Sequence, residues 1–229
     1  PVGRKAAPVA GEALALDIHW PFCLAKCACG DFNSHVRERI PSERFIAALK
    51  RELAHEAARL GRRRLTSIFF GGGTPSLMPP EGVAALIEEA RRLFDTASDI
   101  EITLEANPTS VEIGRLRGFR DAGVNRVSLG IQSLRDEALT FLGREHSATQ
   151  AVQALEMARN IFPRVTFDLI YARPGQSRED WRAELQQALT LVADQVSLYQ
   201  LTVEPGTKFE GLFRQGRLDL PDDDLAAAL

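Results

Sequence analysis

The chain has 229 residues, of which 45% are hydrophobic, and this is enough apolar material for one large core, which argues against a chain that is disordered throughout. Its 28 lysines and arginines are offset by 31 aspartates and glutamates, so it lacks the basic surplus typical of nucleic-acid-binding proteins. No apolar run approaches the roughly 20 residues of a membrane-spanning helix, and residues 1–11 lack the apolar centre of a signal peptide. We therefore expect a cytoplasmic protein that neither binds nucleic acid nor spans a membrane.

Segments with strand and helix patterns alternate along the chain. Apolar runs predict strands at residues 13–19, 65–70, 100–106, 126–131, 165–171 and 195–202. Helical spacing of apolar residues predicts helices at 42–60, 80–94, 111–121, 134–141, 148–161 and 179–192. The first helix is expected to have Ser42 as its N-cap and to stop at Gly61. This order is typical of βαβ crossovers, and about six units predict an α/β fold, a partial (β/α)6 TIM-type barrel.

The same patterns predict how the chain is divided. Residues 1–12 are expected to be a flexible N-terminal segment and residues 13–203 to be the barrel. Residues 204–229 carry turn residues and then Pro221-Asp222-Asp223-Asp224, a typical helix start, so we expect a linker followed by the beginning of a further region.

All the cysteines of the chain lie close together in the segment that follows the first predicted strand, at Cys23, Cys27 and Cys29. Thiolates are soft ligands, and a tight loop can aim them at one point, so this spacing favours a metal or iron–sulfur centre. A disulfide framework is disfavoured because the count is odd and a bridge between Cys27 and Cys29 would be strained.

Further polar or glycine residues stand at the ends of the other predicted strands, where parallel α/β folds bind ligands. The run Gly71-Gly72-Gly73-Thr74-Pro75 either lets a ligand approach the backbone closely or forms a plain tight turn. Asp168 lies inside an apolar strand, where a lone carboxylate is costly to bury unless it is paired or bound to a ligand. Glu105, Gln132 and Arg144 fit either a ligand site or ordinary structural roles.

Several of these stretches form a recognisable pattern. The segment His19-Trp20-Pro21-Phe22-Cys23 is followed by Cys27 and then by Asp31-Phe32-Asn33-Ser34. The stretches 101–108, 125–133 and Pro174-Gly175-Gln176 follow in the same order as in one known family. In these motifs the chain resembles the radical S-adenosyl-L-methionine (radical SAM) enzymes and, among them, the HemW-like family, which is related to the oxygen-independent coproporphyrinogen III oxidases.

The resemblance implies two cofactors. Cys23, Cys27 and Cys29 would hold a [4Fe–4S] cluster, whose fourth iron is chelated by SAM. The positions that match the SAM-binding residues of the family are Gly72, Gly73, Thr74, Glu105, Gln132, Arg144 and Asp168. In this family the cluster reduces SAM by one electron, which yields methionine and a 5′-deoxyadenosyl radical.

The chain departs from the family pattern at two places. The third cysteine stands at Cys29, and Gly30 occupies the position where the family carries it. Asp17 replaces a tyrosine. In an extended segment, a shift of one residue turns the side chain to the other side. One alternative is therefore a barrel that has lost its cluster and kept a binding role.

Phe32 stands where the porphyrinogen oxidases carry a further cysteine, so the resemblance implies a HemW-like heme chaperone in porphyrin and heme metabolism. Such a protein would bind heme, receive electrons from a reducing protein and pass heme to a recipient protein. Its heme contacts are expected in a C-terminal region, which suggests that this chain is a truncated piece. An oxygen-independent coproporphyrinogen III oxidase, which decarboxylates its substrate oxidatively, is the second alternative, so enzymatic activity is left open.

Overall fold

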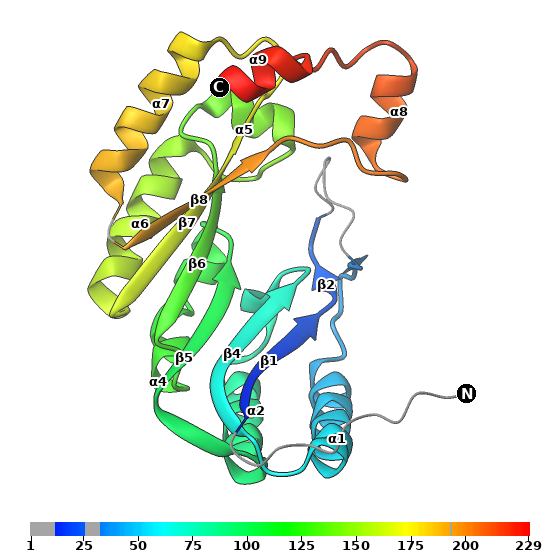
Figure 1. Ribbon diagram of the computed structural model, residues 1–229, viewed down its shortest axis with the longest axis vertical. Coiled ribbons are helices and arrows are strands. Elements are labelled where there is room, and N and C mark those ends of the chain that lie inside the picture. The colour runs from blue at the N-terminus through cyan, green and yellow to red at the C-terminus, as the bar shows by residue number, and fades with distance from the viewer. Residues whose placement is uncertain (1–11, 26–32, 193) are drawn as a thin grey trace.

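The computed structural model describes residues 12–25, 33–192 and 194–229. Its main feature is a sheet of six parallel strands in the order β1-β4-β5-β6-β7-β8, which curls into half of a barrel (Figure 1). The strands are β1 (Ala13–Trp20), β4 (Arg64–Gly72), β5 (Asp95–Ala106), β6 (Arg126–Gln132), β7 (Arg164–Tyr171) and β8 (Gln195–Gln200). The predicted partial (β/α)6 barrel is therefore confirmed.

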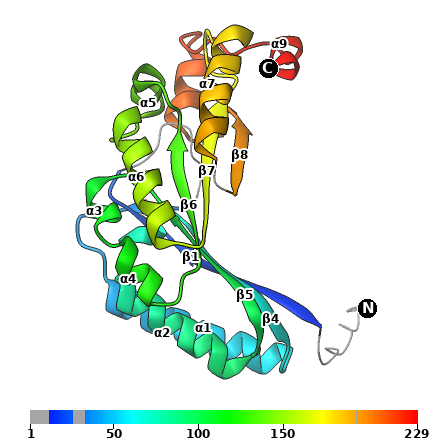
Figure 2. The same cartoon turned by 90° about the vertical axis from the view of Figure 1, so that its left-hand side faces the viewer.

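Helices cover the outer face of the curled sheet (Figure 2). These are α1 (Ser42–Leu60), α2 (Pro80–Leu93), α4 (Leu116–Asp121), α6 (Ala148–Ile161) and α7 (Arg178–Leu191). The 3-10 helix η1 (Pro75–Leu77) and the short helices α3 (Ser110–Ile113) and α5 (Asp136–Leu142) lie in the loops that leave the strand ends. No helix in the described part of the chain is long and apolar enough to cross a membrane.

The central strands alternate apolar and polar residues, and this alternation separates the two faces of the sheet. Ile68, Phe70, Ile102, Leu104 and Val127 are fully buried against the outer helices and belong to one large core. Burial of each such side chain stabilises the fold by about 1.5–3 kcal/mol. The residues between them turn to the inside of the half-barrel, which is consequently polar.

Two local predictions about helix boundaries were wrong. Ser42 is the first residue of α1, and Pro41 occupies the N-cap position without a side-chain hydrogen bond. The predicted helix 111–121 is split into α3 and α4. Gly114 lies between them, and glycine is a poor helix former, so the chain can turn there and direct α3 toward the strand ends.

The sequence analysis missed helix α8 (Lys208–Arg214), which precedes α9 (Asp223–Ala228). Phe209 of α8 stacks on Phe141 of α5, with ring centroids 4.8 Å apart. Together with Leu142, Ile170, Leu201 and Leu218, Phe209 forms a second, smaller core beside the strand ends. Residues 201–218 thus pack against α5, whereas the predicted domain boundaries at residues 12 and 203 stay predictions.

Candidate functional site

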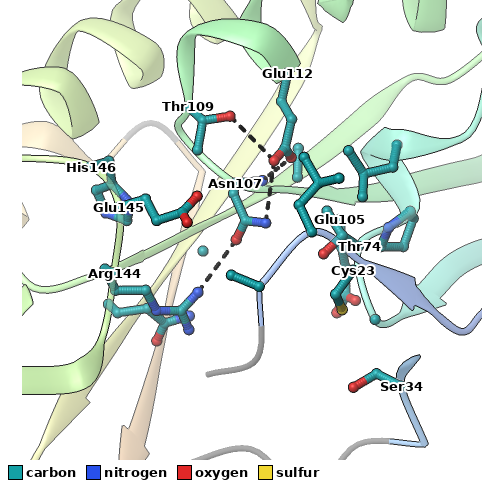
Figure 3. A pocket seen from close by; sticks show the side chains of 18 of the residues that line it. Cys23, Ser34, Thr74, Glu105, Asn107, Thr109, Glu112, Arg144, Glu145 and His146 are labelled. Atoms are coloured by element: carbon teal, nitrogen blue, oxygen red, sulfur yellow. Dashed lines mark hydrogen bonds between the residues drawn. The ribbon is translucent and has the colours of Figure 1, made fainter. Parts of the chain in front are cut away.

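A cavity of about 440 Å³ opens at the carboxyl ends of the strands, and all the SAM-binding positions named above line it. They are Gly72, Gly73, Thr74, Glu105, Gln132, Arg144 and Asp168. Cys23 borders the same cavity (Figure 3). The structure therefore brings together residues from β4, β5, β6, β7 and the α5–α6 loop, whereas their binding of SAM stays a prediction.

Cys23 lies in the short strand β2 (Phe22–Cys23), which pairs with β3 (His35–Val36) and is directly adjacent to the glycine-rich loop. A Cβ atom on Gly73 would lie 2.8 Å from Cys23 Sγ and 2.9 Å from the Phe22 carbonyl oxygen. The Thr74 amide donates a hydrogen bond of 3.0 Å to the same carbonyl. Gly73 is required because it leaves room for the sulfur, so the loop holds this thiol at the cavity wall.

Gly72 and His19 make a second contact between the same loop and the cysteine segment. Gly72 has φ of 114°, and a Cβ atom there would lie 2.8 Å from the His19 ring. His19 Nε2 lies 2.9 Å from the Asn33 carbonyl oxygen. His19 itself is exposed. Its ring links the end of β1 to Asn33.

Glu105 and Asp168 are carboxyl groups on the inner face of the half-barrel. Burial, together with the charges of Asp168 and Asp17, raises the pKa of Glu105 to about 7, against a hydrogen bond from the Gly72 backbone. Burial also raises the pKa of Asp168 to about 6, against hydrogen bonds from Ser197 and Ser128 and the charge of Arg144. Both groups therefore gain from a ligand that donates hydrogen bonds to them, as ribose hydroxyls do.

Arg144 reaches the cavity from the end of α5. The helix ends at Gly143, which adopts a left-handed conformation with φ of 72°. Arg144 Nη1 donates to Asn107 Oδ1 at 3.4 Å, and among the described residues its buried Nε has no partner. Because a buried donor without an acceptor is costly, this guanidinium fits an anionic group such as a carboxylate.

Gln132 lies at the end of β6, where the pairing with β7 shifts register. Its φ is 69°, which a residue with a side chain rarely adopts, and such strain costs about 1–3 kcal/mol. Strained backbone of this kind concentrates at functional sites, which suits the position of Gln132 on the cavity wall.

Several further residues of the cavity were given no role from the sequence, among them Thr109, Glu112, Glu145 and His146. Glu112 was hidden in the predicted helix 111–121, where an acidic residue resembles any solvated helix position. His146 is buried, its Nε2 lies 3.0 Å from the Ile131 carbonyl oxygen, and burial lowers its pKa, so its imidazole is neutral at pH 7. Asn107, noted in the sequence as part of a strand end, joins Glu112 to Arg144 (Figure 3).

A second polar layer lies deeper in the half-barrel, nearer the starts of the strands. Glu101 of β5 pairs with Arg164 at 2.9 Å and with Arg126 at 3.5 Å. Arg126 also donates to Gln195 of β8 at 3.0 Å. These contacts join β5 to β8 across the inner face, so the one carboxylate of this floor layer is paired with arginines of the same layer.

The described residues fit a ligand such as SAM and supply one of the three thiols predicted for the cluster. Cys23 is a free, buried thiol at the wall of the cavity, and the unpartnered Arg144 Nε and two carboxyl groups suit a ligand with a carboxylate and hydroxyls. Within the described ranges no three metal-ligating side chains come together. Cys27 and Cys29, the other two predicted iron ligands, lie outside the described residues.

Comparison with known proteins identifies the family. The model of the radical SAM superfamily matches residues 18–188. A mitochondrial protein of Bos taurus, radical S-adenosyl methionine domain-containing protein 1, is 44% identical over 233 residues, which cover 99% of this chain and 52% of the relative. The heme chaperone HemW of Haemophilus influenzae is 42% identical, with 92% of this chain and 56% of the relative covered. The chain thus spans about half the length of these curated relatives.

Solved structures agree with this assignment. Coproporphyrinogen III oxidase (HemN) from Escherichia coli, described as a radical SAM enzyme, superposes with a TM-score of 0.80 at 26% identity, over 95% of this chain and 50% of that protein. Methylornithine synthase (PylB) shares only the fold, with a TM-score of 0.60 at 16% identity, over 88% of this chain and 57% of that protein. The chain therefore belongs to the radical SAM superfamily and, within it, to the HemW-like family.

Proposed function

We propose that this chain is the radical SAM half-barrel of a HemW-like heme chaperone and that its cavity binds SAM beside a [4Fe–4S] cluster. The observation that carries the proposal is the convergence of the predicted SAM-binding residues on one cavity whose wall includes Cys23 Sγ. The unpartnered Nε of Arg144 in that cavity calls for an anionic ligand group.

The proposal assigns roles to the cysteines and to several of the residues that line the cavity. Cys23, Cys27 and Cys29 would hold the cluster, which supplies the electron for cleavage of SAM. Arg144 binds the carboxylate of SAM through a charge-assisted hydrogen bond. Glu105 and Asp168 accept hydrogen bonds from the ribose hydroxyls, and the loop at Gly73 and Thr74 packs against the methionine part.

The heme-related role is proposed on the basis of the names of the relatives. HemW of Haemophilus influenzae is named a heme chaperone, and the relative in Bos taurus is named as mitochondrial. We propose that heme or a porphyrin is the cargo, that a reducing protein donates the electron and that a recipient protein accepts heme. We assign heme contacts to the part of the relatives' length that this chain does not span, and the cytoplasm is the proposed location.

A coproporphyrinogen III oxidase is the second candidate, because HemN from Escherichia coli has the same half-barrel. The two candidates differ in their products. Anaerobic incubation of the full protein with coproporphyrinogen III, SAM and a reductant would yield vinyl products from an oxidase and none from a chaperone. Vinyl products would therefore overturn the chaperone proposal.

The first experiment measures iron and acid-labile sulfide after anaerobic reconstitution of the chain and of a Gly30→Cys variant, followed by calorimetric titration with SAM. Iron near four atoms per chain in the unmodified protein, with SAM binding, is the expected result. Iron in the variant alone would mean that Cys29 does not replace the missing ligand, and the chain would then be a barrel with a binding role.

A further inference from the structure

We infer that Glu112 is a positioning residue of the cavity, which acts through Asn107 to set the orientation of the Arg144 guanidinium. This inference rests on the proposed function for the identity of the ligand. Glu112 lies on α3 and has 4% of its surface exposed. It belongs to a chain of hydrogen bonds that runs from Ser76, in the loop after β4, through Glu112 and Asn107 to Arg144. Figure 3 shows the part of this chain from Glu112 to Arg144.

The carboxylate of Glu112 accepts hydrogen bonds on both oxygens. Oε2 accepts from the Asn107 backbone N at 2.8 Å and from Ser76 Oγ. Oε1 accepts from Thr109 Oγ1 at 3.2 Å and from Asn107 Nδ2 at 3.4 Å. All these groups are neutral donors, and a carboxylate has enough lone pairs to accept each of them. The loops after β4 and β5 are thereby joined at one buried group.

The contact with Asn107 decides which way its side-chain amide faces. A carboxylate only accepts hydrogen bonds, so Asn107 must direct its NH₂ group to Glu112 Oε1. Its Oδ1 then faces away and accepts from Arg144 Nη1 at 3.4 Å. The reversed amide would direct NH₂ at a guanidinium, which has no acceptor. Glu112 therefore determines that Asn107 presents an oxygen to Arg144.

A glutamine at position 112 would remove this constraint without a change of size. The amide oxygen of the introduced glutamine must face the Asn107 backbone N–H, because this donor cannot reorient. Its NH₂ group would then face Asn107 Nδ2, so the amide of Asn107 would reverse and place its own NH₂ against Arg144. The hydroxyls of Ser76 and Thr109 can rotate to suit either group, so only the Asn107–Arg144 contact is lost.

The test has two measurements on Glu112→Gln, with Asn125→Ala as the control. Asn125 bonds the backbone N of Ile102 at 2.8 Å and the carbonyl oxygen of Ile100 at 2.7 Å, at the far end of the strands. Its loss lowers the melting temperature and leaves the cavity intact. In the ligand-free protein, the NMR signal of the Arg144 Nε–H group is expected to shift in Glu112→Gln and to stay in place in Asn125→Ala. An unshifted signal in Glu112→Gln overturns the inference, whatever the protein binds.

The second measurement is SAM affinity by calorimetry. Glu112→Gln is expected to weaken binding about tenfold, and the double variant with Arg144→Gln is expected to bind no more weakly than Arg144→Gln alone. Unchanged SAM affinity in Glu112→Gln would show that Glu112 does not act through Arg144. The same conclusion would follow if the loss of affinity in the double variant equalled the product of the losses in the two single variants. Failure of the unmodified chain to bind SAM would instead refute the proposed function, and the NMR result would still decide the role of Glu112.

Discussion

Glu101 and Glu105 stand four residues apart on β5, so both side chains face the inside of the half-barrel, yet their surroundings differ. Glu101 is paired with Arg164 and Arg126. Glu105 has no ion pair among the described residues, and its pKa is raised to about 7 by burial and by neighbouring carboxylates. The carboxylate of the lower layer is paired with arginines of that layer, whereas the upper layer leaves charge and hydrogen-bonding groups for a ligand. The same barrel interior thus has a structural floor and a binding level.

The largest expected effect is a difference in SAM affinity between a variant of an arginine in the upper layer and a variant of one in the floor layer. Arg144→Gln removes the group with the unpartnered Nε and is expected to weaken SAM binding about 30-fold or more. Arg164→Gln, the matched change in the floor, loses the ion pair with Glu101 and is expected to leave SAM affinity within about twofold. Calorimetric titration of both variants tests the contrast, and equal losses would contradict the division into two layers.

The next effect is a pH dependence of stability that belongs to the upper layer. Burial raises the pKa of Glu105 from 4.5 to about 7 and that of Asp168 from 3.8 to about 6, so the folded chain retains protons that the unfolded chain releases. The ligand-free protein should therefore lose up to about 6 kcal/mol of stability as the pH rises from about 4 to 8. Urea unfolding across this range measures it.

The matched control for this prediction uses the two glutamates of β5. Glu105→Gln removes a group whose charged form is disfavoured by burial, so the loss of stability between pH 4 and 8 should become smaller. Glu101→Gln leaves both upper carboxyl groups in place and should keep the dependence. A pH profile that Glu105→Gln does not alter would show that these carboxyl groups are not desolvated in the folded protein.

The smallest effect is expected from the floor itself. Its charges are partly exposed, at 34% for the Glu101 side chain and 44% for that of Arg164, so solvent screens their attraction. Glu101→Gln should lower the free energy of unfolding by about 0.5–1 kcal/mol, and the difference from the unmodified chain should shrink in 1 M salt. A difference that is independent of salt would mean that packing, and not charge, holds the floor.

Some features of the site were predictable because they depend on chain order. Parallel strands bring all their carboxyl ends to one edge, so residues placed there by sequence, such as Glu105, Gln132 and Asp168, were expected to meet, and they line one cavity. The contacts between them were not predictable. Asn107 and Arg144 come from different loops, and their hydrogen bond depends on how the loops after β5 and α5 lie at the strand ends.

The sequence by itself determined the alternation of strands and helices and the set of strand-end residues, because apolar periodicity and helix stops such as Gly61 are properties of neighbouring residues. Only the tertiary structure decided which carboxylates are paired and which stay free. Glu101 and Glu105 have similar local sequence, and their different roles come from arginines on other strands. Helix α8 likewise required Phe141 as a partner for Phe209, because long-range packing selects among elements that local patterns leave undecided.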